Sequence, residues 1–128
     1  MSGKQKFYLC KHCGNMIGLI EDKGVPMTCC GEEMTELVAN TEEAIVEKHL
    51  PEVTMSGNNM SVQVGSMPHP MEEAHHIMFV YVETERGGQR KCFRIGEEPQ
   101  LCFSFTDDKP LAVYAYCNLH GMWKTEIR

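Results

Sequence analysis

A cysteine and a histidine lie three residues apart near the end of the chain, in Cys117-Asn118-Leu119-His120. Three further histidines upstream, His49, His69 and His75, can supply more imidazole nitrogens. Zinc, copper and redox-active iron all accept these donors, but they differ in the number of donors and in the geometry that they require. Counting the available donors therefore bears directly on which metal this chain binds.

A second set of soft donors lies near the start of the chain. Cys10 and Cys13 form a CxxC motif, and after fifteen residues a vicinal pair follows, Cys29 and Cys30. A CxxC turn presents two sulfurs to one ion, and four thiolates suit tetrahedral zinc or iron. Composition alone favours a structural zinc knuckle, although adjacent sulfurs must splay and distort the tetrahedron. His12, inside the first pair, is interpreted as an exposed loop residue.

Three kinds of metal compete for the histidine-rich set. The run Cys117, His120, Met122 resembles a blue copper ligand loop. That site needs only one further histidine, and Met122 follows His120 too closely for both to face one ion. A catalytic zinc would use three protein ligands and a water. Four imidazoles and one thiolate instead suit a square pyramid around iron with an open sixth position. His75 and His76 point to opposite faces if extended, so only one of them is expected to bind.

The two sets of donors fall in parts of unequal size. Four of the seven cysteines lie in the first thirty residues, and five of the six histidines lie after residue 48. This shift predicts a small four-cysteine domain over residues 1–38 and a larger domain over residues 39–128. A unit as small as the first cannot bury a sufficient core and needs a metal or disulfides.

The larger part has the pattern of short β-strands separated by turns. About seven strands at this spacing predict an antiparallel sandwich of immunoglobulin type, with the candidate ligands in loops and at strand ends. Residues 41–46 suit a helical turn that Pro51 would stop. The expected strands are Val53–Ser56, Met60–Val64, Ile77–Thr84, Gln89–Arg94, Gln100–Phe105, Leu111–Tyr116 and Met122–Ile127.

The remaining cysteines and the methionines are interpreted as core residues. Cys92 and Cys102 lie within expected strands among apolar neighbours, where a free thiol packs as a small hydrophobe. The ten methionines are expected to fill gaps in the same core.

Charge and hydropathy exclude several classes of protein. A formal net charge of -6 disfavours nucleic acid as a partner. No apolar run approaches the ~18 residues of a membrane span, and the first residues carry no hydrophobic segment typical of a secretory signal. Seven cysteines, an odd number with an adjacent pair, favour metal binding over a disulfide framework. We therefore expect a cytoplasmic protein.

Taken together, these motifs resemble those of desulfoferrodoxins, the two-iron class of superoxide reductases. The resemblance extends over almost the whole chain, and the combination of motifs is highly specific. The motifs are Cys10-x-x-Cys13 with Cys29-Cys30, Glu47-Lys48-His49-x-Pro51, Pro68-His69-Pro70-Met71-Glu72-Glu73-x-His75 and Cys117-Asn118-Leu119-His120-Gly121.

The resemblance implies iron in both sites, against the zinc that composition favours for the first. The small domain would be desulforedoxin-like, and the larger one an immunoglobulin-like superoxide reductase domain of the neelaredoxin type. The first iron would be bound by Cys10, Cys13, Cys29 and Cys30. The catalytic iron would be bound by His49, His69, His75 and His120 in a plane, with Cys117 as the axial ligand. His75, rather than His76, falls on the family's ligand position.

The resemblance also implies a reaction, the one-electron reduction of superoxide to hydrogen peroxide. Glu47 would occupy the sixth position of ferric iron once the product leaves. The charge of Lys48 beside His49 separately predicts that this residue attracts and stabilises the anion despite the acidic chain. A reduced donor protein such as a rubredoxin would supply the electron, and the family's chains typically pair as homodimers. The family sometimes binds a structural calcium, for which this sequence has no firm signature. An electron-transfer protein without substrate chemistry is the alternative.

Overall fold

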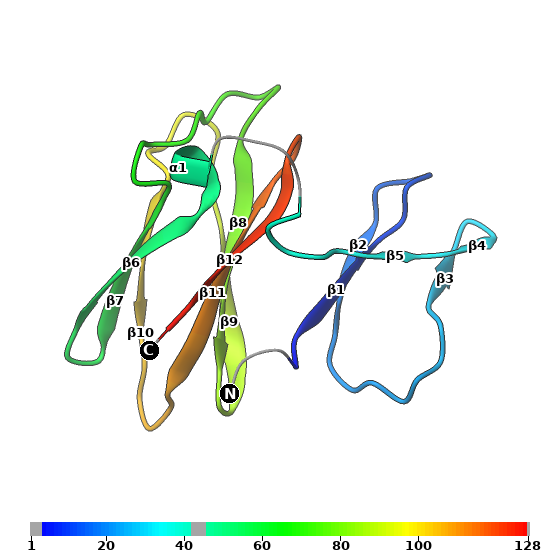
Figure 1. Ribbon diagram of the computed structural model, residues 1–128, viewed down its shortest axis with the longest axis horizontal. Coiled ribbons are helices and arrows are strands. Elements are labelled where there is room, and N and C mark those ends of the chain that lie inside the picture. The colour runs from blue at the N-terminus through cyan, green and yellow to red at the C-terminus, as the bar shows by residue number, and fades with distance from the viewer. Residues whose placement is uncertain (1–3, 42–45, 128) are drawn as a thin grey trace. The chain divides into compact units, whose positions relative to one another are not determined.

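The computed structural model describes residues 4–41 and 46–127, apart from the side chain of Glu47. It divides into two compact units, Gly3–Val38 and the remainder from Ala39 onward. Nearly all regular structure in the described residues is β-strand, as the sequence predicts, and all pairing is antiparallel (Figure 1).

The smaller unit is a three-stranded sheet of order β2-β1-β5 with a separate two-stranded hairpin. Among its described residues, the buried hydrophobic side chains are Phe7 and Cys10. So small a core contributes little stability, which fits a unit that depends on a metal. The strands are β1 (Lys6–Leu9), β2 (Met16–Leu19), β3 (Thr28–Cys29), β4 (Glu32–Glu33) and β5 (Thr35–Glu36).

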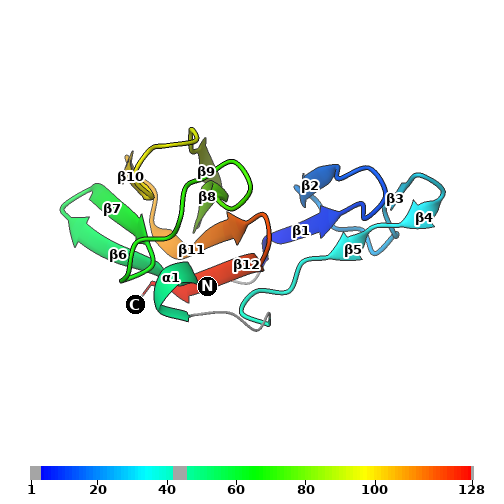
Figure 2. The same cartoon turned by 90° about the horizontal axis from the view of Figure 1, so that it is seen from above.

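The larger unit is a sandwich of two antiparallel sheets, which confirms the predicted architecture (Figure 2). One sheet has the order β10-β7-β6 and the other the order β12-β11-β8-β9. Its elements are α1 (Val46–His49), β6 (Pro51–Ser56), β7 (Asn59–Val64), β8 (Ile77–Thr84), β9 (Gly87–Cys92), β10 (Gln100–Ser104), β11 (Pro110–Cys117) and β12 (Gly121–Glu126).

All seven predicted strands are present, and the limits of β8 agree residue for residue with the prediction. A helical turn follows as α1, which shares only Val46 with the predicted turn and ends at His49, two residues before Pro51. The first part of the predicted turn, residues 42–45, lies outside the described residues. No described helix has the length and apolar character that crossing a bilayer requires.

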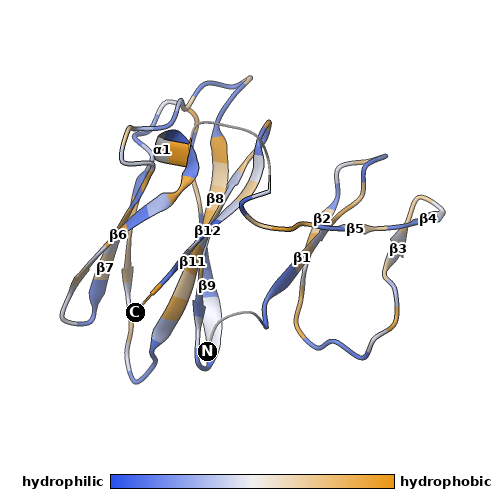
Figure 3. Cartoon of the chain, in the orientation of Figure 1, coloured by the Kyte–Doolittle hydropathy of each residue, from blue (hydrophilic) through white to orange (hydrophobic). Residues whose placement is uncertain are grey.

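Alternation along the central strands builds the core of the sandwich. Val113 and Ala115 of β11 pair with Val82 and Val80 of β8, and all four side chains are fully buried. Successive side chains of a strand point to opposite faces, so these residues share the face that packs on the other sheet. The apolar colouring along β8 and β11 in Figure 3 follows the same pattern.

A β-bulge interrupts the pairing of β8 with β11 near the metal-binding candidates. Tyr116 pairs with Phe79, but Cys117 pairs with Ile77, which leaves Met78 as the extra residue. Met78 is 40% exposed, whereas Ile77 is fully buried. Bulges commonly redirect side chains next to functional sites. Here the bulge lies at the end of β11, beside the first residue of the Cys117–His120 segment.

The prediction that Cys92 and Cys102 are buried is wrong, because both are exposed. They lie on the edge strands β9 and β10, where only one face meets the core. Phe103 takes the inward position on β10, so the preceding Cys102 points out. Cys92 Sγ accepts a hydrogen bond of 2.9 Å from Arg90 Nη1. The methionine prediction is wrong in part, since Met27, Met55, Met67 and Met78 are exposed.

Candidate metal centres

Four histidines and one cysteine meet at one end of the sandwich, the upper end in Figure 1, where α1 and the β11–β12 turn lie. Their potential ligand atoms all lie within 4.8 Å of one another. Each comes from a strand end or a loop: the end of α1 for His49, the β7–β8 connection for His69 and His75, the end of β11 for Cys117, and the following turn for His120.

The four imidazole rings are arranged as a square. Neighbouring rings in the order His49, His69, His75, His120 have centroids 4.6 to 5.1 Å apart and planes 75° to 88° apart. Across the square, the rings of His49 and His75 are 6.5 Å apart and inclined by 33°. This diagonal is longer than the four sides, as expected when four donor rings surround one central point.

The nitrogens that face the centre are not the same on every ring. His49 Nε2 lies 3.1 Å from His69 Nε2 and 3.2 Å from His120 Nδ1. His69 Nδ1 donates a 2.7 Å hydrogen bond to the carbonyl of Pro70, which leaves the lone pair on Nε2 directed inward. The square therefore receives Nε2 from His49 and His69 and Nδ1 from His120.

His75 supplies an independent indication that the cluster accommodates an ion. Its Nε2 atom is buried and has no hydrogen-bond partner. Buried polar atoms without partners are costly and rare in folded proteins. In addition, His49 Nε2 has two nitrogen neighbours at hydrogen-bond distance but can donate at most one proton. A cation at the centre would satisfy all of these lone pairs together.

Cys117 lies beside these rings and is completely buried. Its Sγ atom is 3.8 Å from His120 Nδ1, so the CxxH turn brings sulfur and imidazole to the same place. Burial raises the pKa of the Cys117 thiol, while the backbone N–H groups of Leu119 and His120 donate to the sulfur and oppose that rise. A cation would complete the stabilisation of the thiolate that these two N–H groups begin.

Burial also favours the neutral form of two of the imidazoles, those of His69 and His75, as metal ligation requires. It lowers the pKa of His69 to about 4, and the neighbouring histidines act in the same direction. The pKa of His75 is lowered mainly by burial and by His120, with a smaller contribution from the positive charge of Lys48. That contribution places the half-buried Lys48 within electrostatic range of the cluster. Glu47 lies in α1, but its side chain lies outside the described part of the chain.

The positions of two neighbouring residues, Trp123 and Met122, argue against a blue copper site in this cluster. Trp123 is 3% exposed, and its ring stacks on His49 with centroids 5.0 Å apart and planes 28° apart. Its Nε1 atom donates a 3.0 Å hydrogen bond to the carbonyl of His120. Since alternate residues of a strand point to opposite faces, Met122 is directed away from the face on which Trp123 meets His49. A methionine ligand from that position is excluded.

The second cluster lies in the smaller unit and consists of sulfur alone. The Sγ atoms of Cys10, Cys13, Cys29 and Cys30 lie within 4.8 Å of one another. Cys13 Sγ is 3.6 Å from Cys29 Sγ, and Cys29 Sγ is 4.0 Å from Cys30 Sγ. The structure thus brings together two pairs that are far apart in the sequence.

Two tight turns position these sulfurs. After Cys10, a turn is closed by hydrogen bonds from Gly14 N to Cys10 O (2.9 Å) and from Cys10 N to Asn15 O (2.8 Å). Gly14 takes a φ of 85°, which favours glycine. The second turn joins β3 to β4 and has Cys30 and Gly31 at φ 53° and 78°, as a type I′ hairpin requires. The left-handed backbone at Cys30 lets two adjacent cysteines reach one centre.

The charges of the four thiols cannot develop independently. Backbone N–H groups, that of Cys13 first, lower the pKa of Cys10 to about 6. The sulfurs of Cys13 and Cys10 raise the pKa of Cys30 to about 12 and also raise that of Cys29. Several thiolates at this distance repel one another, so a cation is needed before all four can ionise. This donor set fits a tetrahedral metal ion.

Two histidines considered in the sequence, His76 and His12, lie outside both clusters, and a calcium site is not found among the described residues. His76 Nδ1 donates to the carbonyls of Glu72 and Glu73, which leaves His75 as the member of the pair within the cluster. His12 is exposed, as predicted, with its Nε2 atom 3.0 Å from Glu32 Oε2. Among the residues that the structure describes, no third group of histidine, cysteine or carboxylate side chains gathers, so calcium finds no support.

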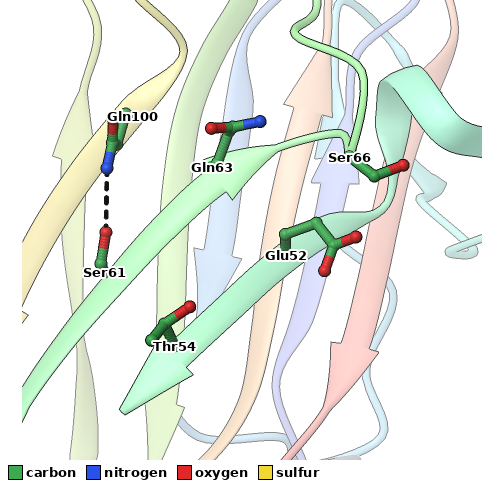
Figure 4. Close-up of a pocket in the computed structure, with 6 residues that line it drawn as sticks. All are labelled: Glu52, Thr54, Ser61, Gln63, Ser66 and Gln100. Atoms are coloured by element: carbon green, nitrogen blue, oxygen red, sulfur yellow. Dashed lines mark hydrogen bonds between the residues drawn. The ribbon is translucent and has the colours of Figure 1, made fainter. Parts of the chain in front are cut away.

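A polar hollow on the β6-β7-β10 sheet is distinct from both clusters (Figure 4). Gln100 Nε2 donates a 3.1 Å hydrogen bond to Ser61 Oγ within it. One carboxylate and several neutral polar groups offer no nucleophile and no set of metal ligands, so we assign it no chemistry. Its lining residues are Glu52, Thr54, Ser61, Gln63, Ser66 and Gln100.

Comparison with known proteins identifies the family. The sequence model described as Desulfoferrodoxin matches residues 41–126, which is the larger unit with its histidine–cysteine cluster. The chain belongs to the desulfoferrodoxin family. Relatives named Desulfoferrodoxin from Syntrophotalea carbinolica and Nitratidesulfovibrio vulgaris are each 36% identical over 126 residues, covering 98% of this chain and 99% of the relative.

Solved structures of the same family match in fold. The crystal structure of the superoxide reductase from Treponema pallidum matches with a TM-score of 0.81 and 33% identity, covering 97% of this chain and 100% of that chain. A one-iron superoxide reductase from Giardia intestinalis matches with a TM-score of 0.54 and 32% identity, covering 64% of this chain and 98% of that one. The first match covers both units of this desulfoferrodoxin, whereas the second covers a smaller share of the chain.

Two residues at the site carry no predicted role in the sequence. Asn118 was seen only as part of a motif, although its side chain bonds to the segment that carries His75. The sequence assigns no role to Trp123, although its ring stacks on that of His49. The spacing of Asn118 between two candidate ligands was a usable signal, whereas the contact of Trp123 depends on the packing of β12.

Proposed function

We propose that this protein is a superoxide reductase, which adds one electron and two protons to superoxide and forms hydrogen peroxide. The observation that carries the proposal is the gathering of four imidazoles in a square and one buried cysteine sulfur, with all five ligand atoms within 4.8 Å of one another. Five donors leave one side of an octahedral ion free for a small ligand. Relatives named Superoxide reductase from Pyrococcus species and the structure from Treponema pallidum support the same activity.

We propose iron for this cluster, which His49, His69, His75, His120 and Cys117 would hold. Iron held there would supply the one-electron redox change that zinc cannot supply. The inward lone pair of His69 and the unpartnered Nε2 of His75 suit a role as metal ligands.

The surrounding protein groups have separate tasks. The N–H groups of Leu119 and His120 donate to the Cys117 sulfur and so hold part of its negative charge. Burial of His49, His69 and Cys117 keeps water from the side of the cluster that faces the core. Lys48 contributes a positive charge that acts on His75, and we propose that it attracts superoxide despite the acidic chain. Glu47 is proposed to bind the open position after the product leaves.

The four-sulfur cluster is proposed as a second iron site within a desulforedoxin-like domain of residues 1–38, followed by the reductase domain of residues 39–128. Four sulfur ligands leave no open position for a substrate, so electron transfer or stabilisation of the small domain suits this site best. The donor is proposed to be a small reduced protein such as a rubredoxin, and the chain to act as a cytoplasmic homodimer.

An absorption spectrum of the purified protein with quantified iron, recorded before and after addition of superoxide, tests the proposal. We expect two irons per chain, rapid oxidation of the histidine–cysteine site by superoxide, and formation of peroxide without oxygen. A colourless protein with two zinc ions would contradict it. Reversible oxidation by other acceptors with no reaction toward superoxide would instead indicate a pure electron carrier.

A further inference from the structure

Asn118 lies between two residues of the histidine–cysteine cluster but carries no part of the proposed chemistry. Three hydrogen bonds join it to the segment that bears His75. Its backbone N–H donates to His76 O (3.1 Å), and its Oδ1 accepts from His76 N–H (2.9 Å). Its Nδ2 donates to the carbonyl of Ala74 (3.0 Å). The contacts therefore flank His75 on both sides.

The orientation of the Asn118 carboxamide follows from its partners. A backbone N–H requires an acceptor and a backbone carbonyl requires a donor, so the oxygen must face His76 and the nitrogen must face Ala74. An aspartate has the same shape but offers no donor, and it would place an oxygen against the carbonyl of Ala74. An alanine would lose both side-chain bonds. Each substitution thus removes a defined part of the contact.

The segment that carries His75 needs such a contact because regular strand pairing stops beside it. The bulge at Met78 is the last irregular step of the β8–β11 ladder before Cys117. Beyond it, His75 lies in a short hairpin with Glu72, in which each residue donates its N–H to the carbonyl of the other at 3.0 and 3.1 Å. Glu72, Glu73 and Ala74 are exposed, so core packing does little to fix this hairpin.

We propose that Asn118 is a positioning residue that clamps the His75 hairpin to the Cys117–His120 turn. The clamp fixes the position of His75 Nε2 relative to the Cys117 sulfur. These two ligand atoms come from different segments of the chain. Through the same turn it fixes the N–H groups of Leu119 and His120 that donate to the sulfur. The inference rests on the proposed function in that these two residues bind the metal.

Asn40 offers a matched control in the same unit. Its Nδ2 donates to the carbonyl of Lys124 (3.1 Å), and its Oδ1 accepts from the N–H of the same residue (2.8 Å). As at Asn118, the carboxamide bonds to one backbone carbonyl and one backbone N–H, but both belong to a single residue, which is not part of the cluster. Because Asn40 has a φ of 61°, aspartate is the suitable replacement at that position. Asn40→Asp and Asn118→Asp therefore remove equivalent hydrogen bonds at two places.

The test measures how fast the full-length protein loses iron from the histidine–cysteine site to a chelator, together with the energy of its thiolate-to-iron charge-transfer band. We expect Asn118→Asp and Asn118→Ala to speed iron loss roughly 10- to 100-fold, as loss of an outer partner of a ligand does. The band should shift in both variants, because the position and hydrogen bonding of the sulfur change. Asn40→Asp should retain the wild-type rate and band.

Wild-type behaviour of both Asn118 variants would overturn the clamp. Equal acceleration by Asn40→Asp would also overturn it, because the effect would then reflect general loss of stability. The same comparison with Co²⁺ as the bound ion separates the clamp from the proposed function. If the wild-type protein fails to bind iron at this site but the Asn118 variants still release Co²⁺ faster than the control, the proposed function fails and the clamp stands.

Discussion

The two metal clusters of this desulfoferrodoxin are built in opposite ways. The four-sulfur cluster lies between two tight turns of a unit with few buried hydrophobic side chains, and Cys13 and Cys30 are exposed. The histidine–cysteine cluster lies at the end of a packed sandwich, where His49 and His69 are each 3% exposed and Cys117 is fully buried. We therefore expect the first site to need a bound metal for its order, and the second to be ordered by the packing of the chain itself.

The same difference separates their chemistry. Four sulfurs close the first site, so an ion there can exchange electrons but cannot take a substrate. Five donors leave the second site one position short of an octahedron. The pKa shifts agree with this division: burial lowers the pKa of His69 in the second cluster, whereas neighbouring thiols raise the pKa of Cys30 in the first. Experiments that perturb one cluster alone therefore test this difference in construction and chemistry.

The largest effect is expected from Cys117→Ser. Loss of the sulfur should abolish the thiolate-to-iron charge-transfer band and lower reductase activity by more than about 100-fold, since loss of even an outer partner costs 10- to 100-fold. Absorption spectroscopy and peroxide formation measure both. Cys92→Ser is the matched control, because that exposed thiol lies outside both clusters, and it should retain band, iron content and activity. Retention of the band in Cys117→Ser would remove the sulfur from the site.

Removal of the metals should unfold one unit and spare the other. Chelation at neutral pH is expected to expose the backbone amides of β1 and β2, because the small core around Phe7 cannot hold that sheet alone. The amides of β8 and β11 should remain protected by the sandwich core. Hydrogen exchange of the metal-free protein measures both. Equal loss of protection in the two units would contradict the contrast between them.

The metal-free sandwich should lose stability in mild acid. Burial holds the pKa of His69 at about 4, below its ordinary value of 6.5, so the unfolded chain binds more protons between these values. Stability is therefore complete above pH 6.5 and falls as pH decreases toward 4, by at most about 3 kcal/mol. Chemical denaturation across this range measures the slope. His69→Gln should flatten it, and an unchanged slope in that variant would assign the effect to other groups.

A smaller effect is expected from Lys48→Ile. Loss of the charge should slow the second-order reaction with superoxide roughly tenfold at low ionic strength and flatten its salt dependence. Both iron sites should remain occupied, because Lys48 is not among the clustered ligand atoms. Pulse radiolysis at several salt concentrations measures the rate. Lys109→Ile, at the far end of β11 beside Pro110, is the matched control and should leave the rate unchanged.

Much of this arrangement can be predicted from the sequence, because the signals are local or chemical. Glycine, proline and asparagine mark the turns, so the predicted limits of β8 agree with those of the structure. The types and spacing of cysteine and histidine select the two donor sets, which the structure brings together. The choice of His75 over His76 came from the family resemblance, since alternation alone does not say which of the two faces inward.

The remainder depends on packing between distant segments. The bulge at Met78 follows from the register of β8 against β11, which no local pattern records. Cys92 and Cys102 have apolar neighbours in sequence, but they lie on sheet edges, where the outward face meets water. The use of Nδ1 by His120 depends on the tight turn after Cys117. The clamp made by Asn118 requires the His75 hairpin to lie beside that turn.

The central claim, that superoxide reacts at the histidine–cysteine cluster and not at the four-sulfur cluster, is tested most directly in a Cys13→Ser variant. The measurement is the second-order rate constant of its reduced form with superoxide by pulse radiolysis, with the yield of peroxide. We predict loss of the first iron but a rate constant and yield equal to those of the unmodified protein. A rate that falls in proportion to the lost first iron, while the thiolate-to-iron band of the second site persists, would contradict the account.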